Sequence, residues 1–288
     1  MRILFTIAHF FNPDSKGKHA SQRKDPQPRL LALSQSLAAL HQLFGKSQSI
    51  INIGQRVAFP ANQPQGYDLD VVICTTKDCH LLNHLPLSSH FYKHHPTQAE
   101  PMLLGFECQA MLRDGLGQYD YYCFLEDDLI LHDPWFFIKL NWFTQQASDL
   151  SLLQPNRYEV STHSLTRKAY IDGDLMPRVT APFQNVHEQP ELQGKIMGMP
   201  ILFRRALNPH SGCYFLNANQ MAYWAKKPYF LDRDTSFVSP LESAATLGIM
   251  KTFQVYKTAP EQASFLEIQH FGTGFIRLIG EKVGLAES

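Results

Sequence analysis

Short apolar segments alternate with longer segments of helical periodicity through the first half of the chain. Buried strands are predicted at 3–8, 69–75 and 119–125, and a helix is predicted at 30–44, where leucines recur every three or four residues before Gly45. Strands and helices that alternate in this way form parallel sheets covered by helices on both faces. The pattern therefore predicts an α/β fold with a mostly parallel, Rossmann-like sheet.

The second half of the chain is less regular, and we expect it to elaborate the same domain with mixed α/β structure. Proline, glycine and polar residues mix between 156 and 200, which favours short antiparallel strands. No internal repeat or low-complexity linker divides the chain, so one domain of residues 1–288 is predicted. Further predicted elements are strands at 49–53, 150–153, 212–216 and, as the last strand, 252–256, and helices at 98–116, 135–147, 217–225 and 240–248.

Composition excludes some classes of partner. Lysine plus arginine and aspartate plus glutamate number 26 each, so the formal net charge is zero and a dedicated nucleic-acid binder is not expected. No run approaches 18 apolar residues, so no transmembrane helix is predicted, while a peripheral membrane contact stays open. The five cysteines are an odd number, and Cys74, Cys123 and Cys213 lie in apolar strands. Buried free thiols in a reducing, cytoplasmic setting are the simplest interpretation.

Three consecutive carboxylates, Glu126, Asp127 and Asp128, directly follow the predicted strand 119–125, and 129–131 are again apolar. Like charges this close repel, and partial burial raises the cost. A divalent cation with oxygen ligands would offset it, and ligands of open α/β sheets bind beyond the carboxyl ends of strands. A metal there would bridge a carboxylate and a diphosphate. The alternative is that one aspartate caps a turn while the others are solvated.

The stretch FLEDDLILHDPWFF, residues 124–137, resembles the DXD-type motif of glycosyltransferases with the GT-A fold, in its Glu-Asp-Asp form. The resemblance covers the motif and, in outline, the preceding α/β half. It implies a GT-A-like domain in which residues 1–155 bind the nucleotide sugar and residues 156–288 bind the acceptor. It also implies Mn²⁺ or Mg²⁺ as cofactor, a nucleotide-diphosphate sugar as donor, and a glycan, a lipid-linked sugar or a small molecule as acceptor.

The resemblance assigns roles to residues of the metal site. Asp128 corresponds to the direct metal ligand, and Asp127 and Glu126 correspond to contacts with the ribose or with the metal through water. A histidine near the C-terminus often adds a ligand in this family, and His270 matches that position, with a surface or core-edge histidine as the alternative.

The resemblance also places the donor's base and ribose at the loop after the first strand, which includes Ala8 and Phe10. Asp70 is a further candidate contact, for which an ordinary role at the start of a strand is the alternative. Basic residues of the loop that would approach the diphosphate are Lys16, Lys18, Arg23 and Lys24, for which a solvated, flexible loop is the alternative.

An inverting enzyme of this kind needs a general base, often a carboxylate at a helix start. Glu242 is one candidate, although Ser239, Pro240 and Glu242 also form the pattern of a helix capping box. Asp234, together with Asp232, is the rival candidate.

The segment 210–217 resembles the acceptor-side strand of such enzymes. Gly212 would let a sugar approach the backbone, and Tyr214 or Trp224 would stack on a sugar face, with packing in the core as the alternative for both aromatic residues.

Two other interpretations of the sequence stay open. A structural zinc site would use cysteine and histidine residues that crowd between positions 79 and 95, but Pro86 and Pro96 interrupt the region and neither a CxxC nor an HExxH pattern is present. The rival functions are a metal-dependent nucleotidyltransferase or phosphohydrolase, against which the lack of a glycine-rich phosphate loop counts, and a non-catalytic nucleotide-sugar-binding module. The candidate zinc ligands are Cys79, His80, His84, His90, His94 and His95.

Overall fold

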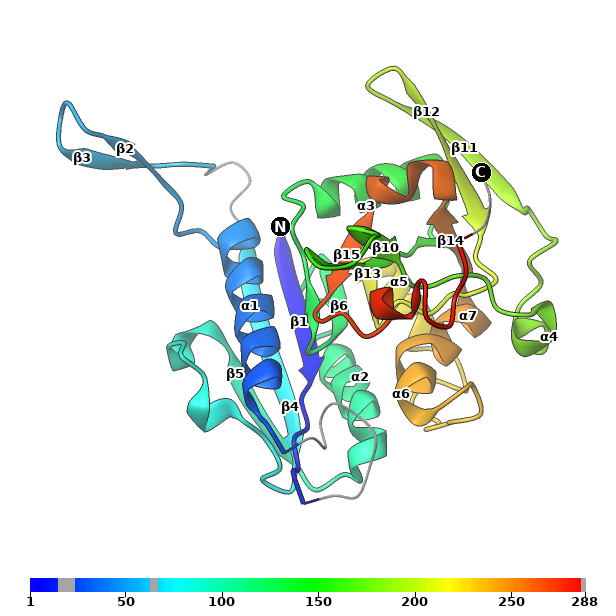
Figure 1. Ribbon diagram of the computed structural model, residues 1–288, viewed down its shortest axis with the longest axis horizontal. Helices are drawn as coiled ribbons and strands as arrows, with labels where there is room; N and C mark the ends of the chain where they lie inside the picture. Colours follow the sequence, from blue (N-terminus) through cyan, green and yellow to red (C-terminus); the bar gives the residue numbers. More distant parts are fainter. Residues whose placement is uncertain (15–23, 63–66, 286–288) are drawn as a thin grey trace.

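The computed structural model describes residues 1–14, 24–62 and 67–285 and shows a mixed α/β fold (Figure 1). A five-stranded sheet has the order β13-β6-β1-β4-β5. All of its neighbouring strands are parallel except β13, which runs antiparallel to β6. This confirms a sheet rich in parallel strands. Its strands are β1 (Arg2–Ala8), β4 (Asp68–Thr76), β5 (Lys93–Thr97), β6 (Tyr121–Glu126) and β13 (Cys213–Asn217).

Different helices cover the two faces of this sheet (Figure 1). Side chains alternate between faces along a strand, so Ile3, Phe5 and Ile7 of β1 pack with α1 (Gln27–Phe44) and α3 (Phe136–Gln146). Leu4 points to the opposite face and packs with α2 (Leu104–Asp114). The three helices predicted in the first half of the chain are present. Because β1, β4 and β6 are parallel, their carboxyl ends lie at one edge of the sheet.

The predicted halves of the chain are interleaved. β13 comes from the second half and joins the first sheet, while strands from before residue 155 join two further sheets, of order β10-β9-β15-β7 and β11-β12-β14-β8. The strand β15 follows the element that we predicted to be the last strand. Strands of these sheets are β7 (Leu129–Ile130), β8 (Ser151–Leu153), β9 (Asn156–Val160), β10 (Lys168–Tyr170), β11 (Glu191–Ile196), β12 (Met199–Arg205), β14 (Gln254–Thr258) and β15 (Glu267–His270).

Two segments differ from the predicted pattern. The strand β2 (Ser49–Asn52) pairs with β3 (Val57–Pro60) in a hairpin that projects from the body and does not join the main sheet (Figure 1). The histidine-rich segment that holds the candidate zinc ligands, residues 79–95, had no predicted strand, but it runs into the edge strand β5. Pro96 fits there because an edge strand tolerates a residue without an N–H group.

The second half contains short helices. The capping box predicted at Ser239 does not form, because the Ser239 side chain makes no capping hydrogen bond; Asn217 and Gln220 form one instead. All five cysteines are free, as predicted. No helix of the described residues is long and apolar enough to cross a membrane. The helices are α4 (Pro177–Thr180), α5 (Ala218–Trp224), α6 (Pro240–Glu242), a π-helical turn (Ser243–Leu247) and α7 (Gly248–Thr252).

Candidate functional site

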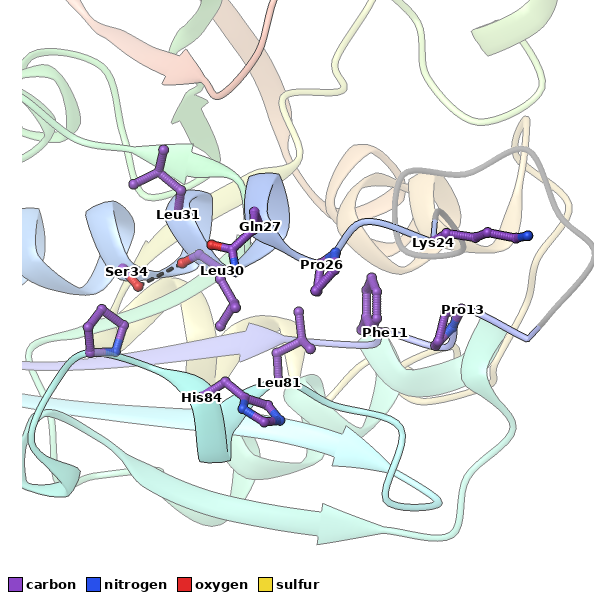
Figure 2. A pocket seen from close by; sticks show the side chains of 11 residues that line it. Phe11, Pro13, Lys24, Pro26, Gln27, Leu30, Leu31, Ser34, Leu81 and His84 are labelled. Carbon is purple, nitrogen blue, oxygen red and sulfur yellow. Dashed lines mark hydrogen bonds between the residues drawn. The ribbon is translucent and has the colours of Figure 1, made fainter.

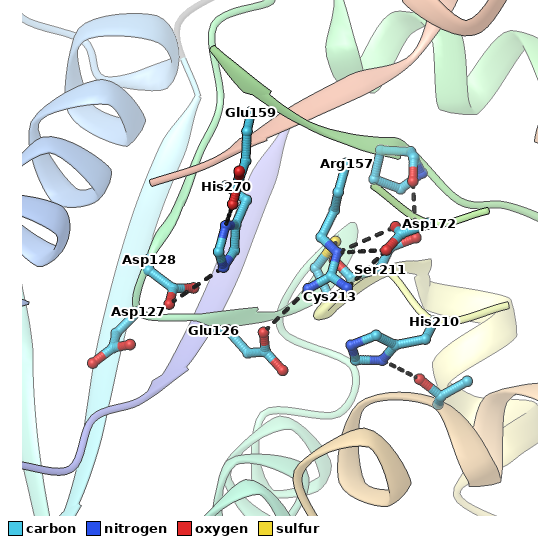
Figure 3. Close-up of polar contacts among 12 residues, drawn as sticks. Glu126, Asp127, Asp128, Arg157, Glu159, Asp172, His210, Ser211, Cys213 and His270 are labelled. Carbon is cyan, nitrogen blue, oxygen red and sulfur yellow. Dashed lines mark hydrogen bonds and ion pairs between the residues drawn. The ribbon is translucent and has the colours of Figure 1, made fainter. Parts of the chain in front are cut away.

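The three consecutive carboxylates lie at the carboxyl end of β6 and point in different directions (Figure 3). Glu126 ends the strand, and Asp127 and Asp128 form the turn that leads into β7. None of the three points freely into solvent, because each contacts a basic side chain of the protein. The charge that we expected a metal to balance is thus shared with Arg29, Arg157 and two histidines.

Asp127 is completely buried and has a structural role. Its carboxylate forms an ion pair with Arg29 and lies 2.5 Å from Nδ1 of His9. Nε2 of His9 accepts a hydrogen bond from the Leu81 N–H group (3.1 Å), so in the neutral ring the proton is on Nδ1, which donates to Asp127. With no exposed surface, Asp127 cannot reach a ribose. The predicted contact is wrong for this residue.

Asp128 is more exposed than Asp127, and one of its two oxygens has no hydrogen-bond partner. Nη1 of Arg29 donates to its Oδ2 (2.9 Å), and Nε2 of His270 lies 3.8 Å from the same oxygen. Its Oδ1 is buried and has no hydrogen-bond partner. Burial raises the pKa of Asp128, but the positive charges of Arg29 and His270 outweigh it and leave the pKa below its usual range. Asp128 is therefore ionised at neutral pH.

The structure brings His270 to Asp128, as predicted, although the two residues are far apart in the sequence. β15 ends at His270 and pairs with β7, which follows Asp128 directly. Nδ1 of His270 is 2.9 Å from Oε1 of the buried Glu159. The other oxygen of Glu159 accepts hydrogen bonds from the N–H groups of Phe275 (2.9 Å) and Ile276 (2.8 Å). Glu159 thereby orients the imidazole and leaves Nε2 directed toward Asp128 (Figure 3).

Burial would lower the pKa of His270, but the hydrogen bond with Glu159 and the charge of Asp128 raise it above the ordinary value. A proton on Nε2 would balance Asp128 in the absence of another cation. The same position would suit a metal ion, which binds the neutral imidazole.

Glu126 turns away from the other two carboxylates, toward Arg157, whose Nη1 lies 3.6 Å from its Oε2. Gly212 lies directly against it: the φ angle of Gly212 is +63°, and a Cβ there would be 2.5 Å from Oε2 of Glu126. Gly212 is thus at the site, as predicted, but its missing side chain makes room for a carboxylate. Burial raises the pKa of Glu126 to about 7 against the charge of Arg157, and the charges of Asp128 and Glu242 add to the rise.

The two candidate bases have different surroundings. Glu242 is half-buried, its Oε2 has no hydrogen-bond partner, and its charge acts on Glu126, so it belongs to the site. Asp234 accepts hydrogen bonds from Nζ of Lys251 (2.8 Å) and the N–H of Ser236 (2.9 Å). The hydrogen bond from Lys251 is the main cause of its pKa of about 2. A carboxylate that holds its proton so weakly is a poor general base at neutral pH.

Of the three candidate donor contacts, two lie near the cluster. Ala8 is the register partner of Glu126, and Phe10 follows in the next loop. Asp70 pairs in register with Leu4, four residues before Ala8 on β1, so it lies toward the opposite end of the sheet. Its carboxylate binds Lys93 and Tyr119 (2.8 Å each). Asp70 therefore has the structural role that was the alternative prediction.

A cavity of ≈ 560 Å³ opens beside the loop after β1 (Figure 2), and we call it the Phe11 cavity. Gln27 and Leu30, which flank Arg29 in the first turn of α1, line one side of it. Leu81 and His84 line the other side. Lys24, one of the predicted diphosphate contacts, is at its rim, whereas Lys16, Lys18 and Arg23 lie outside the described residues.

The aromatic residues predicted to stack on a sugar are core residues. Tyr214 and Trp224 are almost completely buried. Tyr214 stacks on Phe124 with ring centroids 5.4 Å apart and meets Trp224 edge to face at the same distance. Neither ring presents a face to a ligand, so the core alternative is the correct one for both.

The histidine-rich segment does not form a zinc site in the structure. His80 and His94 meet edge to face with ring centroids 5.0 Å apart, and Nε2 of His94 is 2.8 Å from the Thr75 hydroxyl. In the part of the chain that the structure describes, no group of three or more histidine, cysteine, aspartate or glutamate side chains is arranged to hold a metal ion. A metal at the acidic cluster would therefore need ligands from its substrate or from water.

Asp128 and His270 fit such a metal. The orphaned Oδ1 of Asp128 is a hard oxygen donor, and Nε2 of His270 is free and oriented by a buried carboxylate. Nε2 of His270 lies 3.8 Å from Oδ2, the other oxygen of Asp128, whereas neighbouring ligands of an octahedral ion are about 3 Å apart. A small side-chain movement would bring both residues onto one cation.

The site includes residues that sequence reasoning missed: His9, Arg29, Arg157 and Glu159. The sequence held one signal for Arg29. A basic residue in the first turn of a helix interacts unfavourably with the helix dipole, which suggests that an acidic partner lies nearby. Nothing local marks the other three. Comparison of the chain with protein-family models and with curated proteins gives no match.

Proposed function

We propose that the protein is a metal-dependent glycosyltransferase that moves a sugar from a nucleotide-diphosphate sugar to an acceptor hydroxyl. The meeting of Asp128 and His270 is the observation that carries the proposal. These two residues were assigned as metal ligands from a motif and a chain position alone, and they lie together at the carboxyl end of β6, with the imidazole oriented by Glu159.

The proposed roles follow from the contacts. Asp128 and His270 would hold Mn²⁺ or Mg²⁺, which stabilises the charge of a departing diphosphate. Arg29 holds Asp128 in place and is the anchor of the buried Asp127. The Phe11 cavity, next to the first turn of α1, is the proposed place for the base and ribose of the donor. Phe11 and Leu30 give it an apolar lining suited to a base.

Glu242 is the proposed general base. Its Oε2 is buried and has no hydrogen-bond partner, so it has the capacity to accept a proton from an acceptor hydroxyl once the side chain turns toward it. Glu126, whose pKa is about 7, is partly protonated at neutral pH.

A thermal-shift series with UDP- and GDP-sugars, with and without Mn²⁺, tests the proposal. A ligand that binds the folded protein raises the melting temperature by mass action. We expect a rise that requires Mn²⁺ and is lost in Asp128→Asn but kept in the matched surface variant Glu267→Gln. No rise with any nucleotide, or an equal rise in Asp128→Asn, would contradict the proposal.

A second measurement separates an enzyme from a binding module. Release of free nucleoside diphosphate in the presence of an acceptor marks turnover. Glu242→Gln is expected to keep the metal-dependent shift and to lose release by about a hundredfold or more, as for the removal of a general base. A metal-dependent shift without release for any acceptor would favour the binding module.

A further inference from the structure

A second cavity of ≈ 540 Å³ lies between β9, β12 and β14, and we call it the Lys257 cavity. Arg157, Asp172, Arg205 and Lys257 are among the residues that line it. Arg157 connects it with the acidic cluster, because the guanidinium group contacts Glu126 and Asp172 (Figure 3). In that view Arg157 and Asp172 lie on one side of Glu126, and the metal position lies on the other. The Lys257 cavity is therefore on the side of Glu126 away from the metal position.

Positive charge is in excess in the buried wall of this cavity. Arg157, Arg205 and Lys257 are only 8, 9 and 7% exposed. Asp172 forms ion pairs with two of them, Arg157 and Lys257. Arg157 donates three hydrogen bonds to it (2.7–3.2 Å), and Nζ of Lys257 is 3.2 Å from Oδ2. Arg157 and Lys257 thus share Asp172, while Arg157 also contacts Glu126 and Lys257 also donates to the carbonyl oxygen of His210 (2.8 Å).

Arg205 has no carboxylate partner within ion-pair distance among the described residues. Nη1 donates to the carbonyl oxygen of Glu188 (2.9 Å), the guanidinium lies 5.6 Å from the centre of the Tyr256 ring, and the buried Nε has no hydrogen-bond partner. Burial lowers the pKa of Arg205 and of Lys257, which is the expected penalty for cations short of counter-charge.

Other acidic residues of the lining do not remove the excess. Asp174 is exposed, and Glu191 is exposed and pairs with Arg204 at the rim (3.2 Å). Uncompensated cations are costly inside a protein and are retained where they bind something negative. Arginine and lysine are also the residues that bind phosphate and carboxylate groups.

We infer that the Lys257 cavity binds an anionic group, a phosphate or a carboxylate, that the acceptor carries. Lys257 and Arg205 would supply the charge, and Arg157, held by Asp172, would link the anion site to Glu126. That the anion belongs to an acceptor rests on the proposed glycosyl transfer, whereas the anion site itself does not. The proposal narrows the acceptor class to sugars or lipids that bear a phosphate and to acidic glycans.

Titration of the protein with inorganic phosphate and with glucuronate, at low ionic strength and without metal, tests the site. Phosphate and glucuronate separate the two sources of charge, and glucose is the neutral control for glucuronate. We expect at least one anion to bind, and its dissociation constant to rise about tenfold or more in Lys257→Met and in Arg205→Gln. Arg233→Gln, which removes an exposed arginine paired with Glu107, should leave it unchanged.

The location of the anion is checked with Asp128→Asn, in which phosphate binding should persist. No binding of either anion, unchanged binding in both cavity variants, or loss of binding in Asp128→Asn would overturn the inference. Should the cavity variants fail to fold, hydrogen exchange of the wild-type protein decides: phosphate must slow exchange in β12 and β14. If an anion binds but no nucleotide sugar raises the melting temperature, the anion site is supported and its role for an acceptor is refuted. If a nucleotide sugar raises the melting temperature but no anion binds, only the anion site is refuted.

Discussion

Replacing Glu159 by glutamine should change which nitrogen of His270 carries the proton. The Glu159 carboxylate receives the Nδ1 proton of His270 on one oxygen and two backbone N–H groups on the other. In Glu159→Gln the amide oxygen accepts the hydrogen bonds from the N–H groups of Phe275 and Ile276, so the NH₂ group of the amide faces Nδ1 of His270. Nδ1 must then accept a hydrogen bond, which places the proton on Nε2 and removes the lone pair that a metal requires.

The size of the effect follows from these contacts. To bind a metal, the variant must return the proton to Nδ1, which faces the amide NH₂ group and leaves a buried donor unpaired. That costs about 1–3 kcal/mol, or a factor of about 5 to 150 in the dissociation constant for Mn²⁺. Loss of an outer partner of a metal-binding histidine has typically cost about 10- to 100-fold in affinity.

Calorimetric titration with Mn²⁺ in the presence of UDP measures the change, and nitrogen NMR of His270 identifies the tautomer. Glu267→Gln is the control, because Glu267 lies on the same strand but pairs with Lys168 and Tyr170 at the surface. A dissociation constant for Mn²⁺ within about twofold of the wild-type value in Glu159→Gln would refute the reasoning, as would an Nδ1 proton that stays in place.

Three further predictions concern stability. Arg29→Met should lower the free energy of unfolding by about 3–5 kcal/mol in a denaturant titration, because the buried Asp127 loses its arginine partner and keeps only the contact with His9; a loss under about 1 kcal/mol would contradict the role of Arg29. Burial lowers the pKa of His210 to about 3 in the folded protein, whereas in the unfolded chain it is about 6.5. Between these values the unfolded chain binds the proton and the folded protein does not, so this histidine lowers the free energy of unfolding by about 1.4 kcal/mol per pH unit as the pH falls from about 6 to about 4. His210→Gln should reduce that slope, and an unchanged slope would count against it. Gly212→Ala should cost about 1–3 kcal/mol in thermal unfolding, from its positive φ and the clash with Glu126, and a neutral result would be contrary evidence.

Local patterns predicted β1, β4, β6 and β13 of the main sheet because each of these strands is a run of buried apolar residues. Apolar runs identified β1, β4 and β6, and the acidic turn after β6 marked the edge where the candidate site lies. The same reasoning missed β5, since Lys93 to Thr97 is an edge strand with no apolar signature. It also missed β15, whose partners come from 129–130 and 156–158.

Pairing of charges could not be predicted from the sequence. We expected a metal to offset the charge of the three carboxylates, and the structure shows that basic side chains offset part of it. Arg29 and Arg157 are distant from the carboxylates along the chain, and no recognisable spacing links them. These two arginines approach Glu126 and Asp128 only when the sheets have assembled, so their contacts follow from the tertiary structure alone.

The aromatic residues Tyr214 and Trp224 show a different limit. Their strand and helix were predicted, but the pattern of an element does not reveal which of its faces the core will cover. Both side chains pack in one buried cluster with Leu112 of α2, which the local sequence around them does not indicate. The choice between a sugar contact and a core position therefore needed the structure.

The position of β15 has a consequence for how the protein matures. A chain that stopped before residue 267 would keep every strand of the five-stranded sheet, together with α1, α2 and α3, but it would lack His270. The strand β15 inserts between β7 and β9, so Asp128 acquires its imidazole neighbour only when this late segment docks. A nascent polypeptide that has not yet reached residue 270 would thus lack one of the two proposed metal ligands, so under the proposed function metal binding becomes possible only late in synthesis.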